Sequence, residues 1–81
     1  MQYMVIETIK PNSIQLVYER FHREGRMLPN GLIYLDSWLE DQGNRCFQLM
    51  ETDDARLFDQ WIIHWADLVS FEVIKLGTKP E

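Results

Sequence analysis

Apolar and polar residues alternate in two neighbouring segments of the chain, with a turn between them. The stretch from Gly31 to Asp53 has the sequence GLIYLDSWLEDQGNRCFQLMETD. Alternation with a period of two is typical of strands, and the turn residues of the DQG segment at 41–43 divide the stretch in its middle. The pattern therefore predicts a β-hairpin, around which the other elements are arranged.

The turn of this hairpin decides which side chains share a face, because a shift of one residue in the pairing exchanges the faces. A three-residue loop with a bulge at Gly43 in the left-handed region pairs Glu40 with Asn44. The face expected to form the core then carries Ile33, Leu35, Leu39, Phe47 and Leu49. The opposite face carries Tyr34, Asp36, Trp38, Cys46, Gln48 and Met50. A two-residue turn at Gln42 and Gly43 would instead place Phe47, Leu49 and Glu51 beside Trp38, but the bulged register sorts the residues more cleanly.

Two further strands and two helices flank the hairpin. The segment QYMVIETI at 2–9 is rich in β-branched and apolar residues and precedes Pro11, which favours a strand ended by proline. Apolar positions recur at helical spacing from residue 14 to about 26, after Asn12 or Ser13 as a cap, and again over about 54–67, after Thr52. The segment SFEVIKL at 70–76 alternates and predicts the last strand.

The order strand, helix, strand, strand, helix, strand predicts the fold. With a tight hairpin in the middle and two helices that each need one covered face, it is the split βαβ arrangement of the α+β ferredoxin-like class. We expect one domain over residues 1–81, with a four-stranded antiparallel sheet in the order 4-1-3-2. Both helices would cover one face, and the other face, expected to carry Tyr34, Trp38 and Met50, would be bare in a monomer.

The size and composition favour self-association. A chain of 81 residues has one small core, yet 46% of its residues are hydrophobic, among them three Trp, four Phe and three Tyr. Cys46 is alone, so no intramolecular disulfide can form, and no Cys or His spacing matches a zinc site. A homodimer joined through the bare sheet face is the expected source of further stability.

The charge excludes several partners. The formal net charge is −5 and no basic cluster is present, which argues against a nucleic acid and an anionic membrane surface as partners. The chain has no leader pattern and no stretch long enough to span a membrane, so we expect a cytoplasmic protein. His22 and His64 lie at the boundaries of different predicted helices, and neither a metal nor a cofactor is expected.

The half-aromatic, half-polar hairpin face predicts a ligand cleft or a partner surface. The expected ligand-binding residues are Tyr34, Asp36, Trp38 and Gln48, with Glu7 and Met50 beside them. The alternative is that these side chains fill a dimer interface, and the two interpretations are compatible.

Three ionisable groups bear on the chemistry of this predicted cleft. Glu7 and Asp36 can form a carboxylate pair with one raised pKa, which suits proton transfer. Arg26 either pairs with Glu51 or Asp53, or meets an anionic ligand at the mouth of the cleft. No set of residues specifies a reaction.

Three segments carry a resemblance: GRMLPNGL from Gly25, DSWLE from Asp36 and RCFQLMETDD from Arg45. They resemble a bacterial family described as domain of unknown function 3303, over nearly the whole chain. That family is similar to the dimeric α/β barrel group, in which two ferredoxin-like sheets face each other and enclose a cleft. The wider group includes cofactor-free monooxygenases, haem-degrading enzymes and dehydrating enzymes. The resemblance implies the fold and a dimer, and it transfers no catalytic residues.

Two functions are compatible with these observations. One is a small-molecule-binding protein, or a cofactor-free enzyme of the oxygenase or isomerase type acting on an aromatic or carbonyl compound. The other is a non-catalytic dimerisation or regulatory module without a ligand. An open cleft lined by polar groups would favour the first, and a filled, dry interface would favour the second.

Overall fold

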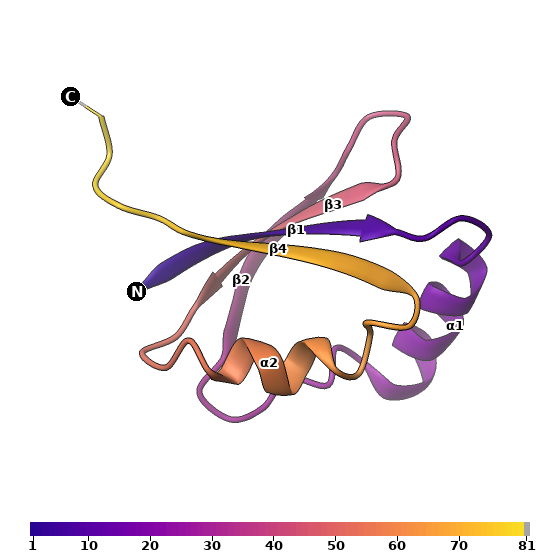
Figure 1. Ribbon diagram of the computed structural model, residues 1–81, viewed down its shortest axis with the longest axis horizontal. Coiled ribbons are helices and arrows are strands. Elements are labelled where there is room, and N and C mark those ends of the chain that lie inside the picture. Colours follow the sequence, from indigo (N-terminus) through magenta and orange to yellow (C-terminus); the bar gives the residue numbers. More distant parts are fainter. Residues whose placement is uncertain (81) are drawn as a thin grey trace.

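The computed structural model describes residues 1–80 and contains six elements (Figure 1). In chain order they are β1 (Gln2–Ile9), α1 (Ile14–Glu24), β2 (Ile33–Leu39), β3 (Arg45–Glu51), α2 (Leu57–Ile62) and β4 (Val69–Lys75). The strands form one sheet in the order β2-β3-β1-β4, and each neighbouring pair is antiparallel. The predicted α+β ferredoxin-like fold and its strand order are therefore confirmed.

The core lies between the sheet and α2. Val5, Met50 and Trp61 have the largest fully buried side chains. The Phe58 ring meets the edge of the Tyr3 ring at 4.9 Å between centroids, and Trp61 meets Phe71 at 5.3 Å. Edge-to-face aromatic pairs of this kind add to the stabilisation from burial alone. In Figure 1, α2 lies below the sheet, whereas α1 stands to the right, beside the end where β4 begins.

The second helix is shorter than the prediction of about 54–67. Asp54 accepts the backbone N–H of Arg56 through its carboxylate, and α2 begins at Leu57. After Ile62 the chain continues in turns, in which Trp65 N–H donates to Ile62 C=O and Leu68 N–H to Trp65 C=O. Bonds at this spacing are those of a tighter 3₁₀-type turn. Within residues 1–80, neither helix is long and apolar enough to cross a membrane.

The β2–β3 register combines the two alternatives that the sequence left open. Near the turn Trp38 pairs with Phe47, as expected for the two-residue turn, whereas Tyr34 pairs with Met50, as expected for the bulged turn. The shift between them lies at an irregularity between Tyr34 and Asp36. The predicted left-handed glycine in the turn is wrong, because Gln42 has the positive φ, at 56°. The bulge thus lies inside β2 and not at the turn.

The assignment of the sheet faces is also corrected. Residues directly opposite each other on paired strands share a face. Tyr3 pairs with Met50 and Val5 with Gln48, on the face that α2 covers. Tyr34, Gln48, Met50 and Glu7 therefore lie on the helix-covered face and not on the bare one. The expectation failed because alternation groups the residues of a face but does not say which group the helices cover.

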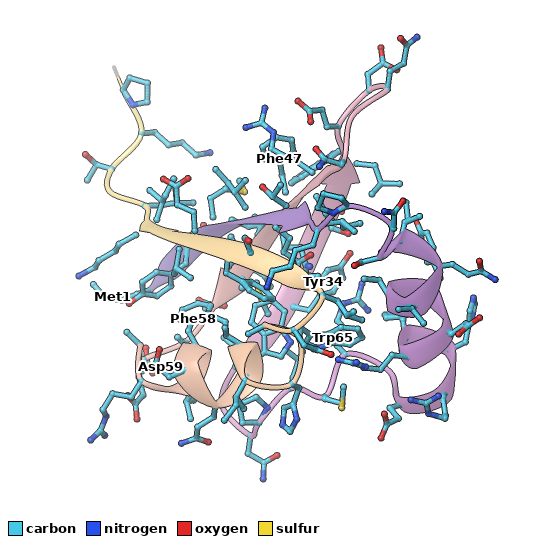
Figure 2. The ribbon with its side chains drawn as sticks, turned by 45° about the vertical axis from the view of Figure 1, so that its right-hand side comes forward. Met1, Tyr34, Phe47, Phe58, Asp59 and Trp65 are labelled. Atoms are coloured by element: carbon cyan, nitrogen blue, oxygen red, sulfur yellow. The ribbon has the colours of Figure 1, made fainter. Side chains whose placement is uncertain are left out.

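The face without helices carries a set of apolar side chains, here called the free-face patch, with Asp36 opposite Leu49 and Glu72 opposite Ile6 on the same face. Its members are Met4, Ile6, Ile33, Trp38, Phe47, Leu49 and Ile74. Phe47 and Leu49, which were expected in the core, belong to this patch. Figure 2 shows Phe47 on the side of the sheet opposite Phe58 and Trp65. Ile33 and Trp38 are 52% and 51% exposed.

The buried position of Met50 makes a prediction about stability. Met50→Ala should lower the free energy of unfolding by about 2–5 kcal/mol, because it removes a fully buried side chain and leaves a cavity. Chemical denaturation followed by tryptophan fluorescence measures this change. Ile63→Ala is the matched control, since Ile63 is 75% exposed, and should change stability by less than about 0.5 kcal/mol. Equal effects of the two substitutions would contradict the core described here.

Candidate functional site

A cavity of about 250 Å³ lies between α1 and the helix-covered face of the sheet. Its buried floor includes Gln48, Trp61, Trp65 and Val69. The exposed side chains at its rim include Tyr18, Phe21, Trp38 and Leu39. The volume is close to the lower end of the range for ligand pockets, and suits a molecule of one or two rings.

The cavity exists because α1 stands away from the sheet. No residue of α1 is buried, although Val17, Tyr18 and Phe21 recur at helical spacing. These three side chains form the α1 wall of the cavity. They were predicted as part of a buried stripe on the sheet, and instead Tyr18 and Phe21 are 45% and 37% exposed.

An ion pair keeps α1 in this position. Two guanidinium nitrogens of Arg20 donate to the two carboxylate oxygens of Asp67 at 2.8 Å, and one of them also donates to the backbone carbonyl of His64 at 2.7 Å. The same guanidinium lies 5.5 Å from the centroid of the Trp65 ring. Hydrogen bonds from Arg20 lower the pKa of Asp67 to about 2. A bidentate pair fixes geometry more strongly than a single contact, so α1 is tied to the turns before β4.

Three polar side chains meet at the floor of the cavity. Glu7 and Cys46 are direct partners across β1 and β3, and the Gln48 amide nitrogen donates to the Glu7 carboxylate. Burial raises the pKa of Glu7, although hydrogen bonds from Gln48 and Cys46 and the charge of Arg26 oppose this. Burial, together with the charge of Glu7, raises the pKa of Cys46 to about 11. At neutral pH Cys46 is therefore a thiol and not a reactive thiolate.

The carbonyl oxygen of the Gln48 side chain, Oε1, is buried and has no hydrogen-bond partner within residues 1–80. Gln48 as a whole is only 6% exposed. A buried acceptor without a donor is costly, at about 1–3 kcal/mol, and is uncommon in folded proteins. A donor group on a molecule in the cavity would remove this cost.

Arg26 enters the cavity from the connection between α1 and β2. It lies between Gly25 and Met27, which have positive φ of 68° and 60°. Its backbone carbonyl accepts the indole N–H groups of both Trp61 and Trp65, at 3.0 and 3.1 Å. Left-handed backbone at a residue other than glycine is strained, and such strain is concentrated at functional sites.

The Arg26 side chain stacks on aromatic rings. Its guanidinium carbon lies 3.7 Å from the centroid of the Tyr34 ring and 5.2 Å from that of Phe21. The expected ion pair with Glu51 or Asp53 does not form: within residues 1–80 no carboxylate lies within 4.0 Å of this guanidinium. Arg26 therefore contributes an unpaired positive charge to the cavity.

The structure brings together only some of the residues predicted as a site. Glu7 and Gln48 lie on the cavity floor, and Trp38 borders the cavity from the edge strand β2. Met50 is fully buried in the core, and Tyr34 lies beneath Arg26.

The expected pairing of Glu7 with Asp36 is wrong. Asp36 pairs with Leu49, whereas Glu7 pairs with Cys46, so the two carboxylates lie on opposite faces of the sheet. The Asp36 carboxylate accepts the backbone N–H of Ser37 instead. Within residues 1–80 no group of His, Cys, Asp and Glu residues suits a metal ion.

The sequence matches a known protein family, but no curated protein or solved structure. The family model described as "Domain of unknown function (DUF3303)" matches residues 1–76. No curated protein and no solved structure shows a match.

The environment of Glu7 makes a prediction about pH. The folded pKa of Glu7 is raised above the ordinary value of 4.5, so the folded state binds more protons than the unfolded state between the two values. Its stabilising contribution is complete below 4.5 and is lost as the pH rises through the folded pKa. Glu7→Gln should therefore stabilise the protein at neutral pH, and the gain should shrink as the pH falls towards 4.5.

Urea denaturation of the wild type and the Glu7→Gln variant at several pH values measures this dependence. The exposed Glu19→Gln is the matched control and should show no such trend. A stability difference between Glu7→Gln and the wild type that does not change with pH would show that Glu7 is not held in a desolvated site.

Proposed function

The chain belongs to the family described as domain of unknown function (DUF3303), and we propose that it binds a small ring-containing molecule in the cavity between α1 and the sheet. The observation that carries this proposal is the unpaired Oε1 of Gln48, a buried acceptor at the cavity floor. The ligand would donate an N–H or O–H group to this oxygen. Its rings would lie against the aromatic walls formed by Phe21, Trp61 and Trp65.

Glu7 supports an extension of this proposal to catalysis without a cofactor. A carboxyl group whose pKa is raised by burial holds a proton to higher pH than an exposed one, and so can serve as an acid as well as a base. It lies beside Gln48, where the donor group of the ligand would sit. A proton transfer of the isomerase type, on a carbonyl or phenolic compound, is the reaction that this arrangement suits. Cys46, as a protonated thiol, has no role as a nucleophile in it.

The free-face patch supports a second element of the function, a homodimer. Its apolar side chains come from all four strands, exposed on β2 and β4 and half-buried on β1 and β3, and an apolar surface of this kind is unusual for a monomer. A second copy of the chain fits it because two such faces are self-complementary about a twofold axis. Dimerisation without a ligand is the alternative function, and it would leave the cavity without a role.

The ligand proposal predicts a specific effect of Gln48. 2-Naphthol, which has two rings and one O–H donor, should bind the wild-type protein and raise its melting temperature. Gln48→Met removes the acceptor while keeping a similar volume, and should weaken this binding by about tenfold. Isothermal titration calorimetry measures both affinities.

Gln60→Met is the matched control, since Gln60 is exposed on α2 and lies outside the cavity lining. If 2-naphthol bound equally tightly to the wild type and to Gln48→Met, its binding would not depend on the Gln48 acceptor. It would remove the main support for the proposal.

The dimer proposal predicts a mass of two chains in light scattering at micromolar concentration. Trp38→Asp places a charge in the free-face patch and should shift the protein to monomer, because an unpaired charge is costly in an interface. Leu16→Asp is the matched control: Leu16 is as exposed as Trp38, at 51%, but lies on α1. A wild-type monomer, or equal effects of the two substitutions, would contradict the proposed interface.

A further inference from the structure

Arg26 differs from the other arginines in having no carboxylate partner. Arg20 pairs with Asp67, Arg45 with Glu40, Arg56 with Asp54 and Arg23 with Glu24. Within residues 1–80, Arg26 takes part in no such pair, and its nearest recorded partner is the face of the Tyr34 ring. Stacking uses the plane of a guanidinium and leaves its N–H edges free to donate in that plane.

The Arg26 backbone is held on several sides, although it lies in the half-buried connection between α1 and β2. Two indole N–H groups donate to its carbonyl, and the residues on both sides have left-handed backbone. A guanidinium on a fixed backbone, with its plane held by Tyr34, loses little further freedom when it binds a planar anion. Preorganisation of this kind increases affinity.

When Glu7 is protonated, the other charged and titratable groups around the cavity do not compensate the positive charge of Arg26. The groups around Glu7 are Gln48 and Cys46 from β3 and Arg26 from the α1–β2 connection. Tyr18 of α1 also lines the cavity, as do the indoles of Trp61 from α2 and of Trp65 from the turns that follow α2. Cys46 is an uncharged thiol at neutral pH. When Glu7 carries a proton, the guanidinium of Arg26 is the only formal charge among these groups, and the cavity favours an anion.

We infer that the ligand is an aromatic monoanion that also carries an O–H group. Its carboxylate is held on the N–H edge of Arg26, its O–H donates to Gln48 Oε1, and its rings lie between Phe21 and the two indoles. This inference rests on the proposed ligand cavity and adds the charge of the ligand to it. Because the anion and an ionised Glu7 would repel each other, binding is coupled to uptake of a proton by Glu7. The affinity for the anion should then increase as the pH is lowered towards the range in which Glu7 is neutral.

The test compares 6-hydroxy-2-naphthoate with 6-hydroxy-2-naphthamide, a neutral molecule of nearly the same shape, by isothermal titration calorimetry. Both compounds carry the O–H donor for Gln48 Oε1, so they differ mainly in charge. The wild-type protein should bind the naphthoate at least about tenfold more tightly than the amide, as expected for one charge-assisted bidentate contact. Arg26→Gln should remove this preference, and Arg26→Lys should keep part of it. Arg23→Gln, an exposed arginine on α1, is the control and should leave the preference unchanged.

A second measurement follows the affinity for 6-hydroxy-2-naphthoate from mildly alkaline to mildly acidic pH. It should rise in the wild type and stay flat in Glu7→Gln. If Arg26→Gln does not fold, as judged by circular dichroism, the wild-type comparison of the two compounds and this pH profile still decide the question.

The outcomes separate this inference from the proposed function. Equal binding of 6-hydroxy-2-naphthoate and 6-hydroxy-2-naphthamide to the wild type, or equal losses of both in Arg26→Gln, would overturn the anion site while leaving a neutral ligand cavity intact. Binding of neither compound at millimolar concentration would overturn both the anion site and the ligand cavity for molecules of this size.

Discussion

The backbone carbonyl of Arg26 connects the segments that lie on the helix-covered face of the sheet. It accepts two indole N–H groups, from Trp61 and Trp65, and so joins the α1–β2 connection to α2 and the turns that follow it. A buried indole without an acceptor would be costly, and here one oxygen serves two. Since Trp61 also packs on Phe71 of β4, the same contact connects the loop to the sheet. The positive φ of Gly25 and Met27, strained at Met27, is found on either side of the residue whose carbonyl both indoles share.

The position of α1 follows from this arrangement. The helix is tied at Arg20 to Asp67 and at its end to the Arg26 loop, while none of its side chains is buried and Val17 packs against the core only in part. The chain thereby gives up the burial of Tyr18 and Phe21, which would add stability in a closely packed ferredoxin-like domain. Natural proteins give up stability in this way where a site needs open space. The cavity occupies the volume that a packed α1 would fill.

The sequence was sufficient to predict the order of the elements and of the strands, because both depend on local periodicity and on short connections. It was not sufficient to identify the covered face. Phe47 and Leu49 are as apolar as a core requires, and only the packing of Phe58 and Trp61 against the other face shows that they lie outside. The register of β2 against β3 could not be predicted either, because no turn residue marks the irregularity beside Tyr34.

The site was less predictable than the fold for a related reason. Glu7 and Gln48 were recognised as members of one face, since alternation and pairing follow from the strands. The cavity beside them depends on an ion pair between residues 20 and 67, far apart in sequence, and on left-handed backbone at Met27. Neither has a local signal, because methionine has no preference for that conformation and an exposed Arg and Asp are common on any surface.

Strand β3 connects the two proposed surfaces while keeping them chemically apart. Its side chains alternate, so Phe47 and Leu49 point to the free-face patch and Cys46 and Gln48 to the cavity. A partner on the free face would therefore contact no side chain of the cavity floor, and would act on it only through the backbone that both sets share. In a central strand that backbone is held on both sides, by β1 and by β2, which limits such displacement. Phe47 and Leu49 are therefore the positions at which assembly can be altered without a direct change at Gln48 and Glu7, whereas Trp38 belongs to the free-face patch and also borders the cavity.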